Sequence, residues 1–180
     1  MKDNFYVITG GPGSGKTTLL NELNKKKFQT IPEDARRIIK EQIKFQGLGL
    51  PWKDKVLYAT LMFNESIKTY QKIRKENPSG IIFFDRGVLD TVCYFIMENI
   101  PIPKKMAVLI NEVIYNRKVF VLPPWKEIYE NDGERKQKWE EAVTTFERMK
   151  EIYIHYGYNL VEVPVGTIEN RLKFVLDEIR

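Results

Sequence analysis

A glycine-rich segment near the start of the chain has the residue types and spacing of a phosphate-binding loop. It matches the pattern G-x-x-x-x-G-K-[ST] and reads Gly10-Gly11-Pro12-Gly13-Ser14-Gly15-Lys16-Thr17. Glycines let such a loop adopt conformations closed to other residues, so that successive backbone N–H groups surround phosphate oxygens at the positive end of the next helix. We therefore predict a P-loop made by these residues together with Thr18.

Two side chains at the end of this loop predict the ligand. Lys16 has the position of the lysine that bridges the β- and γ-phosphates of a nucleoside triphosphate, and the Thr17 hydroxyl has the position of a Mg²⁺ ligand. ATP and Mg²⁺ are therefore the expected ligands. The alternative is a glycine-rich turn that binds nothing, but an apolar run before the loop and a helical pattern after it favour the P-loop.

Asp85 and Arg86 follow the apolar run Ile81-Ile82-Phe83-Phe84, which is typical of a central strand in a parallel sheet. P-loop proteins place an acidic residue at such a strand end to hold Mg²⁺ or its water shell, and we expect this strand to lie beside the first. We predict that role for Asp85, with Arg86 as a clamp on an anionic substrate or on the transferring phosphoryl group. The alternatives are that Asp85 caps the helix beginning near Val88, and that Arg86 only forms a salt bridge with Asp85.

Glu33 and Asp34 follow the second strand-like segment, Phe28 to Ile31, and lie at the P-loop edge of the predicted sheet. One of the two carboxylates, preferably Glu33, could accept a hydrogen bond from a substrate hydroxyl or act as its base. A structural role is the alternative. Thr30 and Glu33 fit the capping-box pattern, and Asp34 has a side chain that often caps a helix.

Charged and aromatic residues crowd the segment 124–139, between the fourth apolar run and a long helical pattern. A loop in this place would act as a lid over the phosphates, with Arg135 reaching the γ-phosphate. The alternative is a solvated helix start whose cations face water.

Five short apolar runs alternate with helical patterns along the chain. The apolar runs are 5–8, 28–31, 81–84, 119–122 and 160–163. The helical patterns are 16–25, 35–43, 54–75, 88–98, 104–115, about 142–153 and 168–179. Such alternation predicts an α/β fold with a five-stranded parallel sheet and helices on both faces, because each parallel crossover needs a helix-sized connection. We expect a single three-layer P-loop NTPase domain over residues 1–180.

Composition limits the possible functions. Of the 180 residues, 43% are apolar and 29% are charged, and 29 Lys and Arg against 24 Asp and Glu give a net charge of +5. These values are ordinary for a soluble globular protein, and the excess charge is too diffuse to indicate nucleic acid. A single cysteine, Cys93, and a single histidine, His155, exclude an internal disulfide and a multi-histidine metal site. We expect Cys93 in the core and His155 at the surface.

The sequence also gives an expectation of location. The chain has no run that approaches the roughly 20 apolar residues that span a bilayer. Its first residues, Met1 to Ile8, do not have the shape of a signal peptide. A cytoplasmic location without a transmembrane segment is therefore the default expectation.

Four segments, in their order and spacing, point beyond a general P-loop protein. They are Tyr6 to Thr18, Pro32-Glu33-Asp34-Ala35-Arg36-Arg37, Phe84-Asp85-Arg86-Gly87 and Pro123-Pro124-Trp125. Together they resemble the NadR-like AAA domain family of P-loop ATPases, which is related to P-loop kinases that phosphorylate nucleosides. The resemblance implies that Glu33 or Asp34 binds an acceptor hydroxyl. It also implies that Asp85 and Arg86 serve magnesium and substrate, and that Arg135 of the lid contacts phosphates.

The residues and the resemblance together favour a small-molecule kinase that binds ATP and Mg²⁺ and transfers the γ-phosphate to a nucleoside-like hydroxyl. The alternative is a nucleotide-binding regulatory ATPase or GTPase that acts through a protein or an anionic-lipid partner. A nucleic-acid-associated ATPase is disfavoured, because the sequence has no basic cluster. A closed acceptor pocket with a carboxylate near the γ-phosphate would distinguish a kinase from a regulator.

Overall fold

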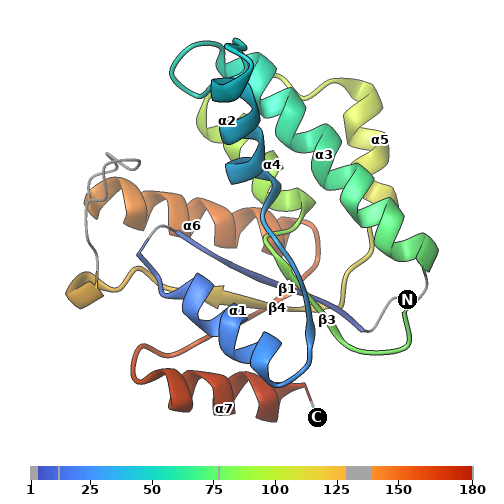
Figure 1. The fold of residues 1–180 in the computed structure, drawn as a ribbon. Helices are drawn as coiled ribbons and strands as arrows, with labels where there is room; N and C mark the ends of the chain where they lie inside the picture. The colour runs from blue at the N-terminus through green and yellow to red at the C-terminus, as the bar shows by residue number, and fades with distance from the viewer. Residues whose placement is uncertain (1–3, 12, 77, 129–138, 180) are drawn as a thin grey trace.

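A parallel sheet of five strands lies at the centre of the computed structural model, which describes residues 4–11, 13–76, 78–128 and 139–179 (Figure 1). The strands are β1 (Phe5–Gly10), β2 (Gln29–Ile31), β3 (Ile82–Asp85), β4 (Lys118–Leu122) and β5 (Asn159–Glu162). Their order in the sheet is β2-β3-β1-β4-β5, and every neighbouring pair is parallel. The predicted α/β fold with a five-stranded parallel sheet is therefore confirmed.

Helices cover both faces of the sheet. The α-helices are α1 (Lys16–Lys25), α2 (Asp34–Lys44), α3 (Lys55–Glu76), α4 (Val88–Met97), α5 (Lys104–Glu112), α6 (Trp139–His155) and α7 (Ile168–Glu178). In Figure 1, α1 and α7 lie below the sheet, whereas α3, α4 and α6 lie above it. The molecule thus has the three layers that the alternation of strands and helices predicts.

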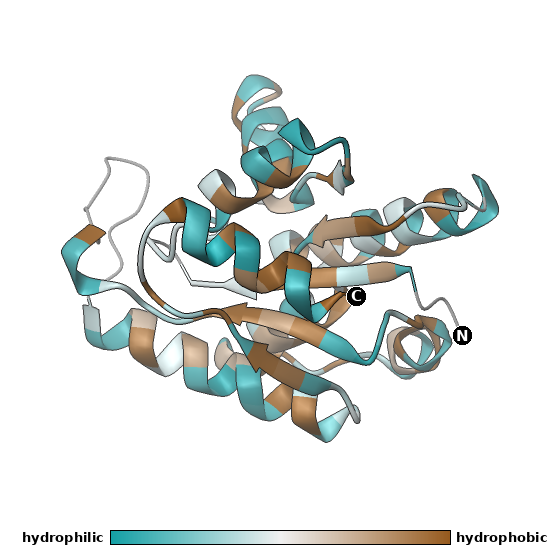
Figure 2. Ribbon diagram, turned by 90° about the horizontal axis from the view of Figure 1, so that it is seen from below, coloured by the Kyte–Doolittle hydropathy of each residue, from teal (hydrophilic) through white to brown (hydrophobic). Residues whose placement is uncertain are grey.

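The sheet residues point alternately into two apolar cores, because successive side chains of a strand face opposite sides. On β1, Phe5 and Val7 pack in the core formed with α3, α4 and α6, whereas Tyr6 and Ile8 pack in the core formed with α1 and α7. All six residues of β1 are buried. Figure 2 shows hydrophobic residues concentrated along the strands, while the helices alternate hydrophobic and hydrophilic segments. A strand that is apolar on both faces needs a helical layer on each side.

One predicted helix is shorter than its pattern. The helix expected to reach residue 115 ends at Glu112, because the chain beyond it is drawn toward α3. There the backbone N–H of Ile114 donates to the Tyr70 hydroxyl at 2.9 Å, and the same hydroxyl donates to the Ile114 carbonyl at 3.0 Å. These bonds replace the next turn of helix and lead the chain into β4.

The carboxyl ends of β1, β2 and β3 meet at one edge of the sheet. β3 pairs with β1 on one side, where Ile8 lies opposite Asp85, and with β2 on the other side. The prediction that the third strand lies beside the first is thus confirmed. This order places the P-loop, which follows β1, beside the residues that follow β2 and β3, at the edge where open α/β sheets bind ligands.

Candidate active site

The P-loop connects the end of β1 to the start of α1. Gly13 has a φ of 69° and Gly15 a φ of 75°, in the left-handed region that residues with side chains rarely adopt. Gly15 is also the N-cap of α1, so the free N–H groups and the positive dipole of the helix face the loop. Pro12, which the sequence assigns to the same loop, lies outside the described residues.

A cavity of about 210 Å³ lies against this loop. Its walls are formed by Gly11, Gly13, Ser14, Gly15, Lys16, Thr17, Thr18, Arg36, Arg86 and Ile128. Three of these side chains are basic and none is acidic, so the cavity suits a polyanion. Its volume is below the roughly 300 Å³ at which pockets for drug-sized ligands begin, which fits a chain of phosphates better than a whole nucleotide.

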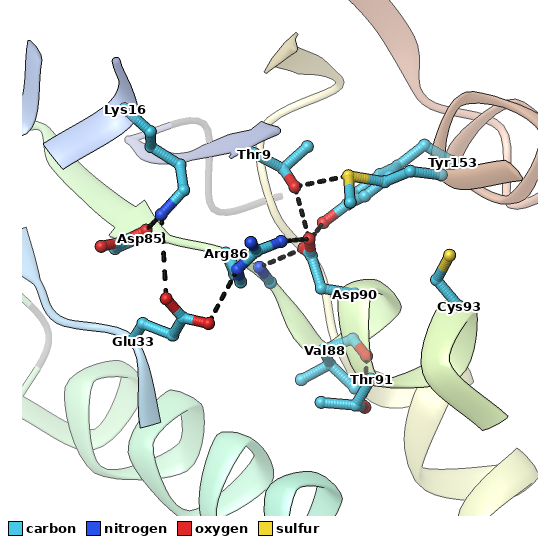
Figure 3. A network of polar contacts seen from close by, with 12 residues as sticks. Thr9, Lys16, Glu33, Asp85, Arg86, Val88, Asp90, Thr91, Cys93 and Tyr153 are labelled. Atoms are coloured by element: carbon cyan, nitrogen blue, oxygen red, sulfur yellow. Dashed lines mark hydrogen bonds and ion pairs between the residues drawn. The ribbon is translucent and has the colours of Figure 1, made fainter. Parts of the chain in front are cut away.

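Lys16 joins the two acidic residues that the sequence places at the strand ends (Figure 3). Its Nζ forms a hydrogen-bonded ion pair with Asp85 Oδ1 and lies 3.9 Å from Glu33 Oε2. Lys16 comes from the first turn of α1, Glu33 from the residue before α2, and Asp85 from the end of β3. All three side chains are at most 15% exposed. Three predicted site residues, far apart in the sequence, are thus in one cluster.

Burial dominates the electrostatics of Lys16. Removal from water lowers the pKa of its ammonium group, and the positive charge of Arg86 lowers it further, while Asp85 and Glu33 oppose both effects. A lysine in this state gains from every added negative charge. A triphosphate in the cavity would supply such charge, so the ligand and the charged form of Lys16 would stabilise each other.

Arg86 occupies a strained backbone position between two carboxylates. Its φ is 72°, which a residue other than glycine adopts only at an energetic cost. Its guanidinium donates through Nε to Glu33 Oε1 at 2.9 Å and through Nη1 to Asp90 Oδ1 at 3.0 Å. Burial acts to lower the pKa of Arg86, but the charges of Glu33 and Asp90 outweigh it and raise the pKa. These two ion pairs differ from the alternative considered above, in which Arg86 would only form a salt bridge with Asp85.

Asp90 is the hub of this network, and the sequence analysis missed it (Figure 3). Its Oδ1 accepts hydrogen bonds from Arg86 and from the Thr9 hydroxyl. Its Oδ2 accepts from the Gly87 N–H at 2.8 Å and from the Tyr153 hydroxyl at 2.7 Å. This carboxylate thus accepts four hydrogen bonds, and one of them holds the guanidinium of Arg86 in place. Arg86 lies before α4, so its spacing of four residues from Asp90 was not a helix-face signal in the sequence.

The capping box considered for Thr30 and Glu33, and the helix cap considered for Asp34, are wrong. Glu33 occupies the N-cap position of α2, but its side chain makes no capping hydrogen bond and is held in the cluster described above. Thr30 belongs to β2. Asp34 is the first residue of α2, and its carboxylate accepts hydrogen bonds from Arg37 and from Thr69 of α3, each at 3.0 Å. Glu33 therefore faces the P-loop, whereas Asp34 faces α3. Of the two candidates, the geometry favours Glu33.

The oxygen atoms of Thr17 and Asp85 fit the preference of Mg²⁺. Gly87 is the N-cap of α4, so the capping role considered for Asp85 is wrong. Thr17 lines the cavity. The Asp85 carboxylate pairs with Lys16, which belongs to the same loop and also lines the cavity. Among the described residues there is no group of three or more His, Cys, Asp or Glu side chains that could hold a metal by itself. A hydroxyl and one carboxylate suit Mg²⁺, which is usually bound through one or two protein groups together with substrate phosphates.

Most of the predicted lid lies outside the described residues. This applies to residues 129–138, which include Arg135. The described part of the predicted segment comprises Pro124, Trp125, the short 3₁₀ helix η1 (Lys126–Ile128) and Trp139, with which α6 begins. The roles of the lid and of Arg135 stay predictions.

Two further arginines at the site were not among the predicted catalytic residues. Arg36, from α2, lines the cavity and stands in the quoted segment 32–37, which was a local signal. Arg171, from α7, donates to the Ser14 carbonyl of the P-loop at 2.9 Å. Arg171 is 157 positions from Ser14 in the sequence, so no local pattern connects the two residues.

Cys93 and His155 lie as expected. Cys93 is 2% exposed and packs in the apolar core, where burial raises the pKa of its thiol to about 12, and His155 is exposed at the end of α6. Neither residue contributes to the site. Among the described helices, none is both long enough and apolar enough for a bilayer crossing.

The sequence matches one family over most of its length. Residues 5–171 match the family described as the AAA domain, and no curated protein matches the chain. The family match therefore identifies the family, and no curated match supplies a substrate.

Several solved structures share the fold. Deoxyadenosine kinase from M. mycoides, solved with dCMP and dCDP, has a TM-score of 0.66 and 16% identity, covering 97% of this chain and 98% of the kinase. NadR in complex with NR has a TM-score of 0.72 and 21% identity over 98% of this chain, which spans only 50% of the NadR chain. Thymidylate kinase from Candida albicans has a TM-score of 0.64 and 17% identity, covering 98% of this chain and 90% of that enzyme. At these identities, the similarity shows a fold shared with nucleoside and nucleotide kinases.

Proposed function

Since the chain belongs to the AAA domain family, which it matches over residues 5–171, we propose that it is a P-loop kinase that transfers the γ-phosphate of ATP to a hydroxyl of a nucleoside-like molecule. The fold shared with nucleoside and nucleotide kinases supports this proposal. The observation that carries it is the position of Glu33, a carboxylate held 3.9 Å from the P-loop lysine. A carboxylate at that point could accept the hydrogen bond and the proton of an acceptor hydroxyl.

The P-loop and its basic neighbours would bind the triphosphate. The backbone N–H groups of the loop would surround the phosphate oxygens, and Lys16 would turn from Asp85 to the β- and γ-phosphates. Arg36 and Arg86 line the same cavity and would stabilise the charge on the transferring phosphoryl group.

Glu33 would hold the acceptor hydroxyl. Arg86 donates to its Oε1 at 2.9 Å, and its Oε2 lies 3.9 Å from Nζ of the P-loop lysine. Once Lys16 contacts phosphate, Oε2 can accept the hydrogen bond of the acceptor hydroxyl and take its proton. The hydroxyl oxygen then forms a bond to the γ-phosphorus as the bond from that phosphorus to the leaving oxygen of ADP breaks.

Mg²⁺ would be held by the Thr17 hydroxyl and the Asp85 carboxylate. When bound, it would neutralise charge on the β- and γ-phosphate oxygens. Asp85 suits this role because it ends β3 at the P-loop, and its carboxylate would be released for the ion when Lys16 turns to the phosphates.

A screen of nucleosides and related alcohols with ATP and Mg²⁺ tests the proposal, with ADP release and product mass followed together. We expect one class of nucleoside to gain a single phosphoryl group at the rate at which ADP appears. Lys16→Ala should lose both signals. If ADP is released at the same rate with every compound and no compound gains mass, the protein is not a kinase for this class.

A nucleotide-binding regulatory protein is the second candidate, and one observation favours it. The connection between α2 and α3 exposes three large apolar side chains, Phe45 (72%), Leu48 (63%) and Trp52 (62%). Large apolar groups at a surface often mark contacts with another protein or a membrane. Such a protein would consume ATP regardless of acceptor and would bind its partner in only one nucleotide state.

A further inference from the structure

Arg171 packs against the P-loop and does not line the cavity. From α7, its Nη1 donates to the backbone carbonyl of Ser14 at 2.9 Å. The residue is 2% exposed. A Cβ added at Gly15 would lie 2.5 Å from Nη1, so the guanidinium packs directly against the loop.

This guanidinium is buried at an energetic cost. In the described part of the chain, Nε and Nη2 of Arg171 are buried without a hydrogen-bond partner. Burial lowers the pKa of the group, because removal from water disfavours the charged form. The Trp125 ring lies 5.7 Å from the guanidinium carbon and offsets part of this cost. A buried cation with unused donors contributes little to stability, so its presence calls for another explanation.

The contact with Ser14 sets the direction of a phosphate-binding group. The Ser14 carbonyl and the Gly15 N–H belong to one peptide unit, which is planar and trans, so the two groups point in opposite directions. Arg171 holds this carbonyl and is not itself among the residues that line the cavity. The N–H at the other end of this peptide belongs to Gly15, a residue that lines the cavity.

We propose that Arg171 is a positioning residue for the triphosphate, which fixes the Ser14–Gly15 peptide with its N–H directed at a phosphate oxygen before the ligand binds. The inference rests on the proposed binding of ATP at the P-loop. A donor that is oriented in advance loses less entropy on binding and needs no reorganisation. A positive charge at the carbonyl end also polarises the peptide and strengthens its N–H as a donor.

Arg171→Met tests the inference, because methionine fills much of the same space without a donor or a charge. A hydrogen bond from a charged group contributes enough that we expect ATP affinity, measured by calorimetry, to fall roughly tenfold or more. The melting temperature should stay at the parental value or rise, since a buried cation with unused donors is removed. Arg171→Lys keeps a charged donor and should regain most of the affinity. Inorganic tripolyphosphate should show the same losses as ATP, since the contact acts on phosphates.

Arg117, an exposed arginine at the other end of the sheet, offers a control for the substitution itself. It also donates to a backbone carbonyl at 2.9 Å, that of Gly157, and its guanidinium carbon lies 5.9 Å from an aromatic ring, that of Tyr158. Arg117→Met should therefore leave the affinity for ATP unchanged.

Three outcomes would overturn the inference. Parental ATP affinity in Arg171→Met would overturn it and leave the proposed kinase intact. A loss of affinity that parallels a fall in melting temperature, and that lysine does not restore, would make Arg171 a structural residue. If the parent protein binds neither ATP nor tripolyphosphate, the proposed function fails together with this inference.

Discussion

At the scale of single residues, the proposed transfer depends on a carboxylate whose two oxygens face different partners. Glu33 is held by Arg86 through Oε1 and faces the P-loop lysine through Oε2. We expect Glu33→Gln to lower the rate of phosphoryl transfer about 100-fold or more, because an amide cannot take the proton of the acceptor. ATP affinity should change little, since the amide keeps the shape of the side chain. The melting temperature should fall, because Arg86 keeps only one of its two carboxylate partners. Initial rates, calorimetry and thermal melting on the two proteins measure these effects.

Glu41 gives the control for this substitution. It lies on α2, eight positions beyond Glu33, and pairs at the surface with Arg37 at 3.0 Å. Glu41→Gln should keep the parental rate of transfer. A parental rate in Glu33→Gln as well would remove Glu33 from the reaction.

Asp90 supports the site through its charge as much as through its shape. Asparagine in its place would turn an NH₂ group toward groups that now donate hydrogen bonds to the carboxylate, such as the Gly87 N–H and the Tyr153 hydroxyl. It would also leave Arg86 with one carboxylate partner instead of two. We expect Asp90→Asn to lower the free energy of unfolding by about 2 to 4 kcal/mol, measured by urea denaturation. For comparison, Glu151→Gln removes a surface pair with Arg148, whose partners are 56% and 63% exposed. It should cost less than about 0.5 kcal/mol, and an equal cost of the two substitutions would contradict the role of Asp90.

The sequence indicates site residues whose signal is local. Lys16 belongs to a continuous motif, and Asp85 and Glu33 stand just beyond apolar runs that mark strand ends. Asp90 was missed because its donors come from β1, α6 and the start of α4, and meet only when these elements pack. Arg171 was missed for the same reason, since its partner in the P-loop is 157 positions away.

At the scale of elements, the start of α4 packs so closely that a Cβ at Gly87 would overlap its neighbours. A Cβ there would lie 2.9 Å from the Tyr153 hydroxyl and 3.1 Å from Val7 Cγ2, while the φ of −110° is ordinary. We expect Gly87→Ala to lower the free energy of unfolding by about 1 to 3 kcal/mol through steric overlap alone. Gly80→Ala is the matched control, because nothing lies within 4 Å of the added Cβ. Equal urea midpoints for the two variants would show that the contact at Gly87 yields without cost.

The strands, the helices and the pairing of the third strand with the first could be predicted, because strand and helix patterns are local. The helix caps and the full order of the strands could not. Thr30 and Glu33 match a capping box in sequence, yet Thr30 pairs with Phe83 in the sheet, so the ladder between β2 and β3 determines its conformation. The alternation of elements indicates parallel strands without fixing all their neighbours. The position of β5 beside β4, for example, follows from packing that no local pattern contains.

At the scale of the whole molecule, buried acids make the fold sensitive to alkali. Burial raises the pKa of the Cys93 thiol from 9.0 to about 12 and that of the Tyr58 hydroxyl from 10.0 to about 12. The unfolded chain loses these protons first, so the native state binds more protons above pH 9 and the free energy of unfolding falls as pH rises. Lys16 acts in the opposite direction, because its lowered pKa makes the native state release a proton before the unfolded chain does.

Cys93→Ala isolates one of these groups. The contributions of Lys16 and of the buried tyrosines are the same in the parent and the variant, so their difference reports the thiol. We expect the free energy of unfolding of Cys93→Ala to be lower at neutral pH, because a cavity is left, but to fall less steeply between about pH 8 and about pH 10. Urea titrations at several pH values measure both slopes, and parallel slopes would show that the thiol titrates alike in the folded and unfolded chain.

The most direct measurement follows the γ-phosphoryl group itself. ATP labelled with oxygen-18 in that group is incubated with Mg²⁺, the protein and each nucleoside, and mass spectrometry then locates the label. For the parent protein we expect the labelled phosphoryl group on a nucleoside hydroxyl, and for Glu33→Gln about 100-fold less of that product in the same time. Label found only in inorganic phosphate, with every nucleoside unchanged while ATP is consumed, would contradict phosphoryl transfer by this site.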